Sequence, residues 1–287
     1  MSIIVTASTG QLGALVVDAL LARGAAPADV VATARNASKL QAFADKGVTT
    51  AALDYTKPET VTAVVKPGDT LVLISGSDLG KRVEQHSAVI QAAKDAGIAR
   101  IVYTSAPAAD DTALILAPEH KATEEFLIGS GVPFTILRNG WYTENYVSQI
   151  AAGRDHGELV ASVGDGRVAS ASRSDYAEAA AVAALDASTA GKTYELSGDY
   201  AWSFDELAAA VSGIVGKPVS YRAVSPAEHA EILKGAGLDE GTVGFVVGLD
   251  GNIRDGLLAV TTGELKELIG HPTVPLAEGL AAAAPAA

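Results

Sequence analysis

The chain has 287 residues, which is enough for one large α/β unit with an added lobe, and therefore for one active site. Its 34 acidic and 21 basic side chains give a formal net charge of −13. That charge argues against binding to nucleic acid or anionic lipid, since both need clustered Lys and Arg, while the absence of cysteine excludes disulfides, thiolate metal sites and thiol nucleophiles.

The first predicted element is an apolar strand over residues 2–6, followed by a glycine-bearing turn and a helix that begins at Leu12. A helix that starts at the end of a parallel strand directs its unpaired N–H groups and positive dipole end at a bound diphosphate. Gly10 lets the backbone approach this phosphate, and Gly13 lets the helix pack on the sheet. Ala7 stands where the usual fingerprint has its first glycine, and its methyl group penalises a positive φ. The segment predicts a dinucleotide site.

Strands and helices alternate over about the first half of the chain. Apolar, β-branched runs predict buried parallel strands at residues 30–34, 70–74, 100–104 and 133–137. Helical stretches are predicted at residues 38–46, 82–96 and 119–128, each closed by a glycine, namely Gly47, Gly97 and Gly129. This alternation predicts an α/β fold with a doubly wound parallel sheet of the Rossmann type, which binds ligands at the carboxyl ends of its strands.

The second half of the chain is less regular. Ser174 and Asp175 are expected to cap a helix over residues 176–185, and residues 193–196 are expected to form a strand. A capping-box signature at Ser203 starts another helix. These signals predict a smaller, mainly helical lobe in the C-terminal half.

Arg35 occupies the position that selects between the two pyridine nucleotides. In NAD-preferring sites an acidic residue at the end of the second strand accepts hydrogen bonds from the ribose 2′-OH. A guanidinium fork is suited to a 2′-phosphate instead, so the sequence predicts NADP(H) as the cofactor. We expect residues 1–150 to form the NADP-binding Rossmann domain and residues 151–287 the smaller substrate lobe, with strands that return to the main sheet.

Eight segments carry a resemblance to a known family: residues 6–13, 34–36, 73–77, 103–105, 137–146, 164–177, 202–204 and 268–273. The Arg-Asn-Gly-Trp-Tyr sequence at 138–142 and the Gly-Asp-Gly sequence at 164–166 are the most specific of them. With these motifs the chain resembles the NmrA-like group of atypical short-chain dehydrogenases over essentially its full length. Within that group it is similar to the quinone reductases.

The resemblance implies a set of cofactor contacts. The phosphate turn of the family falls on Ala7, Ser8, Thr9, Gly10, Gln11 and Leu12, and its ribose-phosphate arginine falls on Arg35. The segment on the nicotinamide side falls on Ser75, Gly76 and Ser77. The loop after the sixth strand falls on Gly140, Trp141, Tyr142, Thr143, Glu144 and Asn145, and a further cofactor contact falls on Arg173.

The chain lacks the Tyr-x-x-x-Lys pair with which an ordinary short-chain dehydrogenase protonates an alkoxide, because none of its eight tyrosines has lysine four positions later. Hydride addition to a quinone is less demanding, since it gives a delocalised phenolate. We therefore expect an NADPH-dependent reductase that transfers a hydride to quinones or similar planar acceptors by holding them against the cofactor, without a flavin.

Two groups of side chains are candidates for work on the substrate. His120 and Lys121, at the start of a helix, are candidate catalytic donors of a proton or hydrogen bond to a quinone oxygen. Trp141, Tyr142 and Tyr146 offer flat apolar faces on which an aromatic substrate could stack. The five histidines have no paired spacing, so no metal is expected.

Two alternatives stay open. One is a non-catalytic regulatory protein of the NmrA type that senses NADP(H), and the other is a reductase of another acceptor, such as a dye, an imine or a ketone. The expected partner is a small-molecule electron acceptor, and a homodimer is the base-rate expectation for the oligomeric state. Because no basic leader precedes an apolar stretch and no window reaches the length of a membrane span, we expect a cytoplasmic protein.

Overall fold

The computed structural model describes residues 1–284 and contains two compact units. Unit 1 consists of Met1–Asp110, Leu116–Asn139 and Arg173–Leu196, and unit 2 consists of Asp111–Ile115, Gly140–Ser172 and the residues from Ser197 onward. The two units interleave along the chain because the segment 173–196 returns to the sheet of unit 1. The expected NADP-binding domain over residues 1–150 and the substrate lobe over residues 151–287 stay predictions.

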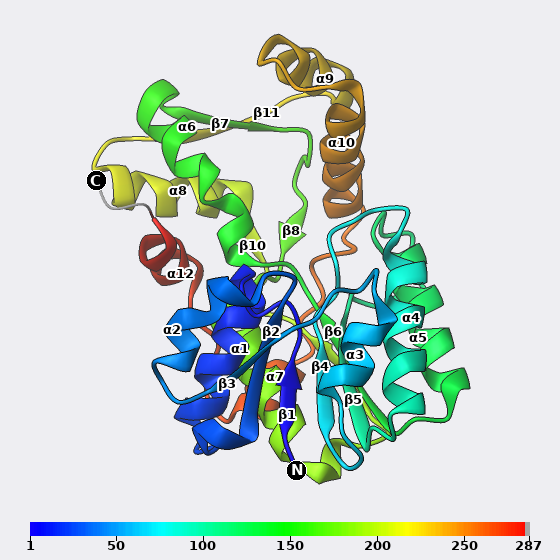
Figure 1. Cartoon of the computed structure of the whole chain (residues 1–287). Helices are drawn as coiled ribbons and strands as arrows, with labels where there is room; N and C mark the ends of the chain where they lie inside the picture. Colours follow the sequence, from blue (N-terminus) through cyan, green and yellow to red (C-terminus); the bar gives the residue numbers. More distant parts are fainter. Residues whose placement is uncertain (285–287) are drawn as a thin grey trace. The chain divides into compact units, whose positions relative to one another are not determined.

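Unit 1 is built on a seven-stranded parallel sheet with the strand order β3-β2-β1-β4-β5-β6-β9 (Figure 1). Its strands are β1 Ile3–Val5, β2 Val30–Ala34, β3 Thr49–Ala52, β4 Thr70–Leu73, β5 Arg100–Ser105, β6 Phe134–Asn139 and β9 Thr193–Leu196. In β1, Ile3 pairs with Val30 of β2 on one side and with Thr70 of β4 on the other. The strand order reverses between β1 and β4, and sheets of this type bind their ligands at the carboxyl ends of the strands where the order reverses. The predicted doubly wound Rossmann sheet is confirmed.

Helices cover both faces of this sheet. Helices α1 Gln11–Ala22 and α7 Arg173–Leu185 pack together on one face, and α3 Pro58–Val64, α4 Arg82–Asp95 and α5 Ala117–Ser130 lie side by side on the other (Figure 1). Short elements complete the unit: η1 Pro27–Asp29, η2 Ala37–Leu40, α2 Gln41–Ala44 and η4 Ala187–Thr189. Fully buried Leu71, Ile101, Ile136, Val89 and Ile90 belong to the apolar core between the sheet and the α4 side.

Three helix boundaries differ from those predicted. The helix expected over 38–46 is a 3-10 turn followed by the four residues of α2. Gly129 does not stop α5, because the helix continues to Ser130 and ends at Gly131, whose φ of 75° gives the left-handed cap. Ser174 and Asp175 do not cap α7 either, since that helix already includes them. Two nearby glycines, or two nearby polar residues, give equal local signals, so tertiary packing sets the boundary.

Unit 2 combines short sheets with helices. Its parallel pair joins β7 Glu158–Ala161 to β11 Ser220–Ala223, and its antiparallel pair joins β8 Arg167–Val168 to β10 Trp202–Ser203. The remaining elements are η3 Thr143–Tyr146, α6 Ser148–His156, α8 Phe204–Val215, α9 Pro226–Gly235, α10 Glu240–Arg254, α11 Glu264–Ile269 and α12 Leu276–Ala283. The predicted capping box at the start of α8 is present, with Ser203 accepting from the Glu206 N–H. In the described part of the chain, no helix is both long and apolar enough to cross a membrane.

Candidate cofactor site

The turn between β1 and α1 is closed by its own backbone. Ala7 has a φ of 49°, and its carbonyl oxygen accepts a hydrogen bond from the Gly10 N–H at 2.8 Å. A Cβ atom at Gly13 would overlap the Ala7 carbonyl group, and one at Gly10 would lie 3.1 Å from its oxygen. Both glycines therefore let α1 approach the turn closely. Alanine adopts the left-handed conformation at residue 7 at a cost of roughly 1–2 kcal/mol.

The first turn of α1 presents hydrogen-bond donors without an acceptor from its cap. Gly10 is the N-cap residue, no side chain accepts from this turn at the cap, and the turn contains no acidic residue. Thr9, Gly10 and Gln11 are exposed. The first N–H groups of a helix have no carbonyl partner within the helix, and the dipole favours negative charge there. This donor set fits the diphosphate of a dinucleotide.

Ser8 contributes to the framework beneath the turn. It is buried, its hydroxyl donates to the Val5 carbonyl at 2.9 Å, and its oxygen accepts from the Thr33 N–H at 3.1 Å. The Ser8 contacts hold the ends of β1 and β2 together. Thr6, the residue after β1, is held separately, because its hydroxyl oxygen accepts from the hydroxyl of Tyr55, which follows β3, at 2.5 Å. The Ser8 hydroxyl therefore makes its hydrogen bonds to the backbone of β1 and β2.

Arg35 follows β2 directly and is exposed at the carboxyl edge of the sheet. Within residues 1–284, no hydrogen bond or ion pair holds its guanidinium. Its charge acts on Asp54, which follows β3: the pKa of Asp54 is lowered, chiefly by the Thr56 N–H and in smaller part by Lys57 and Arg35. An exposed guanidinium beside the phosphate turn is suited to a 2′-phosphate.

The segment Ser75–Gly76–Ser77 leaves the end of β4, next to β1 in the sheet, and its backbone is fixed by side chains from two other elements. The Ser75 N–H donates to the Thr104 hydroxyl at 2.9 Å. The Gly76 N–H donates to Nε2 of His86 at 3.0 Å, and the Gly76 carbonyl accepts from Nε of Arg82 at 2.8 Å. The structure thus brings this segment, the phosphate turn and Arg35 to neighbouring strand ends of one sheet.

His86 is fully buried and neutral. Its Nε2 accepts from Gly76, so the ring proton is on Nδ1, which lies 3.2 Å from the Thr123 hydroxyl oxygen. Thr123 can accept this proton because its own hydroxyl donates to the Glu119 carbonyl at 2.8 Å. Burial lowers the pKa of His86 to about 3, and the charge of Arg82 acts in the same direction. This role of His86 is not predictable from local sequence patterns, because His86 and Gly76 lie on different elements.

The candidate proton donors have contrasting surroundings. His120 is 6% exposed, with Nδ1 2.8 Å from the Tyr103 hydroxyl, and burial lowers its pKa to about 3. At neutral pH its imidazole is therefore uncharged. Lys121 is exposed, and its Nζ donates to the Asp110 carbonyl at 2.9 Å. A catalytic role for either residue stays a prediction.

A buried charge cluster closes the carboxyl ends of β5 and β6. Arg138 donates from Nε and Nη2 to the two carboxylate oxygens of Glu124 at 3.0 and 2.7 Å, and from Nη1 to Glu195 at 2.8 Å. The Ser105 hydroxyl donates to the same Glu124 carboxylate at 2.5 Å. Glu195 also accepts from the N–H of Ala108, whose φ is 45°. The cluster holds the chain that follows β5 in place.

The remaining predicted residues lie at the start of unit 2, apart from Arg173, which is the first residue of α7 in unit 1. Thr143 is buried, its N–H donates to the Ala171 carbonyl at 2.9 Å and its hydroxyl lies 2.8 Å from Ser170 Oγ. Gly140, Trp141, Tyr142 and Glu144 are half-buried, and Asn145 is exposed. Tyr146 is buried with its ring edge-on to Trp202, at a centroid distance of 4.9 Å. Cofactor or substrate contacts by these residues stay predictions.

Known proteins similar to this chain share its fold and most of its length. A family model described as NAD(P)H-binding matches residues 7–187. Quinone oxidoreductase 2 of Escherichia coli (strain K12) is 43% identical over 278 residues, which cover 97% of each chain.

Two solved structures are similar over nearly the whole chain. That of an NADPH-dependent quinone oxidoreductase from Escherichia coli complexed with NADPH has a TM-score of 0.92 and 43% identity, covering 98% of this chain and 99% of that one. That of the Citrobacter sp. triphenylmethane reductase complexed with NADP(H) has a TM-score of 0.92 and 34% identity, covering 99% and 100%. With the phosphate turn and the strand order of its sheet, the chain therefore belongs to the NAD(P)H-binding family, as its resemblance to the NmrA-like group predicts.

Proposed function

We propose that this protein is an NADPH-dependent reductase that transfers a hydride to quinones or similar planar electron acceptors. The observation that carries the proposal is the 43% identity to quinone oxidoreductase 2 over 97% of each chain. It is supported by an α1 N-terminus without a capping side chain or a carboxylate, and by the exposed Arg35 beside it.

The chain's own residues would bind and orient the cofactor, which when bound supplies the hydride. The N–H groups at the start of α1 would hold the diphosphate, and Arg35 the 2′-phosphate. Gly76 would keep its place because His86 and Arg82 hold its N–H and carbonyl group. A loop that is already fixed loses little conformational entropy when a ligand binds. The free energy of binding is therefore more favourable than it would be for a flexible loop that makes the same hydrogen bonds.

The acceptor needs positioning more than acid catalysis. Reduction of a quinone gives a delocalised phenolate, so proximity and orientation supply much of the rate. Trp141, Tyr142 and Tyr146 would offer stacking faces, while His120 and Lys121 are the candidate proton donors. A Lys121→Ala variant with unchanged turnover would remove that residue from the mechanism.

A second acceptor class is favoured by one comparison. The chain is 34% identical to the Citrobacter triphenylmethane reductase over 99% of its length, so a triphenylmethane dye is the alternative acceptor. The expected small-molecule partner fits both classes. The expected homodimer, the cytoplasmic location and the absence of nucleic-acid binding stay predictions.

The test is anaerobic oxidation of NADPH with a panel of quinones, triphenylmethane dyes, imines and ketones, together with an absorption spectrum of the purified protein. Turnover with quinones and no flavin bands is expected. Turnover with dyes alone would identify triphenylmethane dyes, rather than quinones, as the acceptors. Turnover with a ketone alone would refute both acceptor classes. Binding of NADPH without turnover of any acceptor would favour a regulatory sensor.

Arg35→Ala tests the cofactor contact, and Lys66→Ala is a matched control. Lys66 is exposed and precedes β4, at the opposite edge of the same sheet, so its removal changes the net charge equally but not the site. We expect the Michaelis constant for NADPH to rise only in the Arg35 variant. An equal rise in both variants would mean that general electrostatic attraction, rather than a contact with Arg35, binds the 2′-phosphate.

A further inference from the structure

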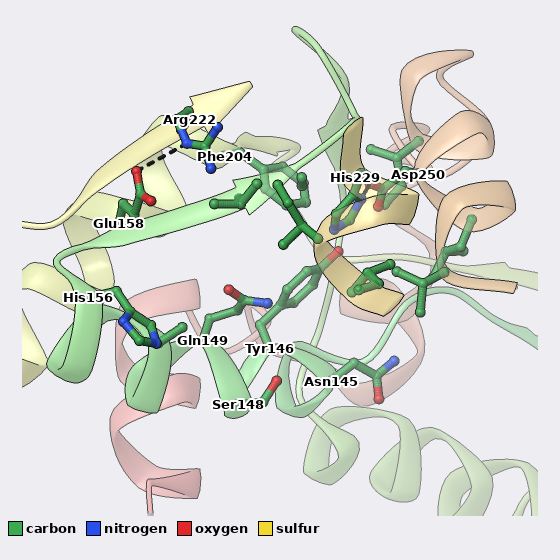
Figure 2. Close-up of a pocket in the computed structure, with 18 of the residues that line it drawn as sticks. Asn145, Tyr146, Ser148, Gln149, His156, Glu158, Phe204, Arg222, His229 and Asp250 are labelled. Carbon is green, nitrogen blue, oxygen red and sulfur yellow. Dashed lines mark hydrogen bonds and ion pairs between the residues drawn. The ribbon is translucent and has the colours of Figure 1, made fainter. Parts of the chain in front are cut away.

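Unit 2 contains a cavity of 510 Å³ that is lined by η3, α6, β7, α8, α9 and α10 (Figure 2). Most of its wall is apolar, with Trp141, Val160, Phe204, Leu233 and Ile253 among the contributing side chains. A volume and lining of this kind are typical of small-molecule sites, which place a few polar groups in an apolar wall. The polar groups in this wall therefore indicate what the cavity binds.

One end of the cavity holds a buried histidine–carboxylate pair. His229 of α9 is 5% exposed and Asp250 of α10 is 6% exposed, and His229 Nδ1 lies 2.8 Å from Asp250 Oδ2. The same carboxylate oxygen accepts from the N–H and the hydroxyl of Ser162, at 2.6 and 2.9 Å. An oxygen that already accepts from the Ser162 N–H and hydroxyl is a poor position for a proton of its own, so we assign the proton between the pair to Nδ1.

This arrangement defines what His229 can offer to a ligand. In the neutral ring a proton on Nδ1 leaves Nε2 as an acceptor. Within residues 1–284, no hydrogen bond joins Nε2 to another group. Asp250 orients the ring, and the lining of the cavity includes both residues.

Tyr146 supplies a donor to the same cavity. The residue is 7% exposed, and its hydroxyl oxygen is buried without a hydrogen-bond partner among the described residues. Burial, and then the charge of Asp250, raise the pKa of Tyr146, so the phenol keeps its proton. The nearby Trp141 indole N–H is a donor and cannot accept that proton. Figure 2 shows the Tyr146 hydroxyl directed toward the side of the cavity formed by His229 and Asp250.

We propose that this cavity binds a planar hydroxyaromatic ligand, a phenol, whose oxygen accepts from the Tyr146 hydroxyl and whose proton is donated to Nε2 of His229. A hydroxyl group satisfies both partners, whereas a quinone or ether oxygen only accepts and leaves Nε2 unpaired. Water could make the same hydrogen bonds to Tyr146 and His229, but it would not bury the apolar side chains that line the cavity. The cavity shares Trp141 and Tyr146 with the proposed acceptor contacts, but binding of a phenol needs no cofactor and is tested separately from the reductase activity.

Isothermal titration calorimetry of the full chain without NADPH tests the proposal, with 1-naphthol and 1-methoxynaphthalene as probes. The two probes share their rings, but only naphthol has a proton to donate. We expect naphthol to bind about 10-fold more tightly than the ether, which is the effect of one buried acceptor left unpaired. Equal affinities, or no binding of naphthol, would overturn the proposal.

Three variants separate the contacts. Tyr146→Phe removes the donor and should weaken both probes by about 10-fold, while His229→Leu should weaken naphthol to the level of the ether and leave the ether unchanged. Ala152→Phe, on the α6 side of the cavity, places a ring in the cavity and leaves Tyr146 and His229 themselves unchanged, so it should abolish binding of both probes. This variant decides the matter if His229→Leu fails to fold.

Tyr200→Phe is the matched control. Tyr200 is exposed in the same unit, and its hydroxyl bonds to Glu206 outside the cavity. Binding of both probes should be unchanged in this variant. A naphthol preference that survives His229→Leu, or binding that survives Ala152→Phe, would place the ligand elsewhere and refute the assignment.

Discussion

Two buried neutral histidines should make this protein sensitive to mild acid. Burial lowers the pKa of His86 and of His120 from 6.5 to about 3. Below pH 6.5 the unfolded chain binds protons that the folded protein does not, so stability falls as the pH falls from 6.5 toward 3. At pH 5.0 the gap of 1.5 units to the unfolded pKa corresponds to about 2 kcal/mol for each histidine, or about 4 kcal/mol for both.

The assay is urea unfolding at pH 7.5 and pH 5.0, compared between the wild type and His86→Gln. Glutamine can present an oxygen near the position of Nε2, so it can keep the acceptor for the Gly76 N–H, but it does not titrate. The loss of unfolding free energy between the two pH values should be about 2 kcal/mol smaller in the variant. Carboxylates also titrate, but they contribute equally to both proteins.

If His86→Gln lost as much stability in acid as the wild type, the neutral buried imidazole would be refuted, and with it the hydrogen bond by which His86 accepts from Gly76.

Three further changes test the site. Arg35→Ala should weaken NADPH binding by about 10-fold or more and leave NADH binding nearly unchanged in calorimetry, and equal losses would remove the 2′-phosphate assignment. Gly13→Ala drives a methyl group into the Ala7 carbonyl, so we expect a loss of about 1–3 kcal/mol in thermal or urea unfolding together with weaker NADPH binding. An equally stable variant would contradict the close approach of α1. Glu124→Ala removes the bidentate carboxylate of Arg138 but leaves Asp110 and Glu195 within 2.6 and 2.8 Å of its Nη1, so we expect the unfolding free energy in urea to fall by about 1–3 kcal/mol. A loss below about 1 kcal/mol would mean that the other carboxylates near Arg138 suffice to pair it.

The sequence predicted the parts of the site whose cause is local. A β-branched strand, two glycines at the required spacing and an uncapped helix start are consecutive in the chain, so the phosphate turn is visible before any tertiary contact is known. Arg35 is visible for the same reason, because it follows directly on β2. The left-handed φ of Ala7 is not predicted by the sequence, because a methyl group penalises that conformation.

The parts that the sequence did not predict depend on partners from different elements. His86 lies on α4 and Gly76 follows β4, and no spacing rule relates an imidazole to a backbone N–H ten residues earlier. The cluster of Arg138, Glu124 and Glu195 draws on β6, α5 and β9. Paired spacing indicates a metal-binding histidine, and a position at the start of a helix made His120 a candidate proton donor, but neither signal identifies a histidine that accepts from a backbone amide.

The chemistry of a buried imidazole depends on which nitrogen has a partner, and the two clearest cases in this chain are opposite. In His86, Nε2 accepts from the Gly76 N–H and the Nδ1 proton is directed at the Thr123 hydroxyl. Both ring nitrogens therefore have a partner within the protein, and His86 acts on a ligand only by holding the loop. His229 directs Nδ1 to Asp250, which leaves Nε2 without a partner among the described residues. The same cavity is lined by Tyr146, whose hydroxyl group has no hydrogen-bond partner either. His86 is therefore a positioning group and His229 the proposed contact group. The difference arises from the elements packed around each ring and not from the neighbouring residues in the chain.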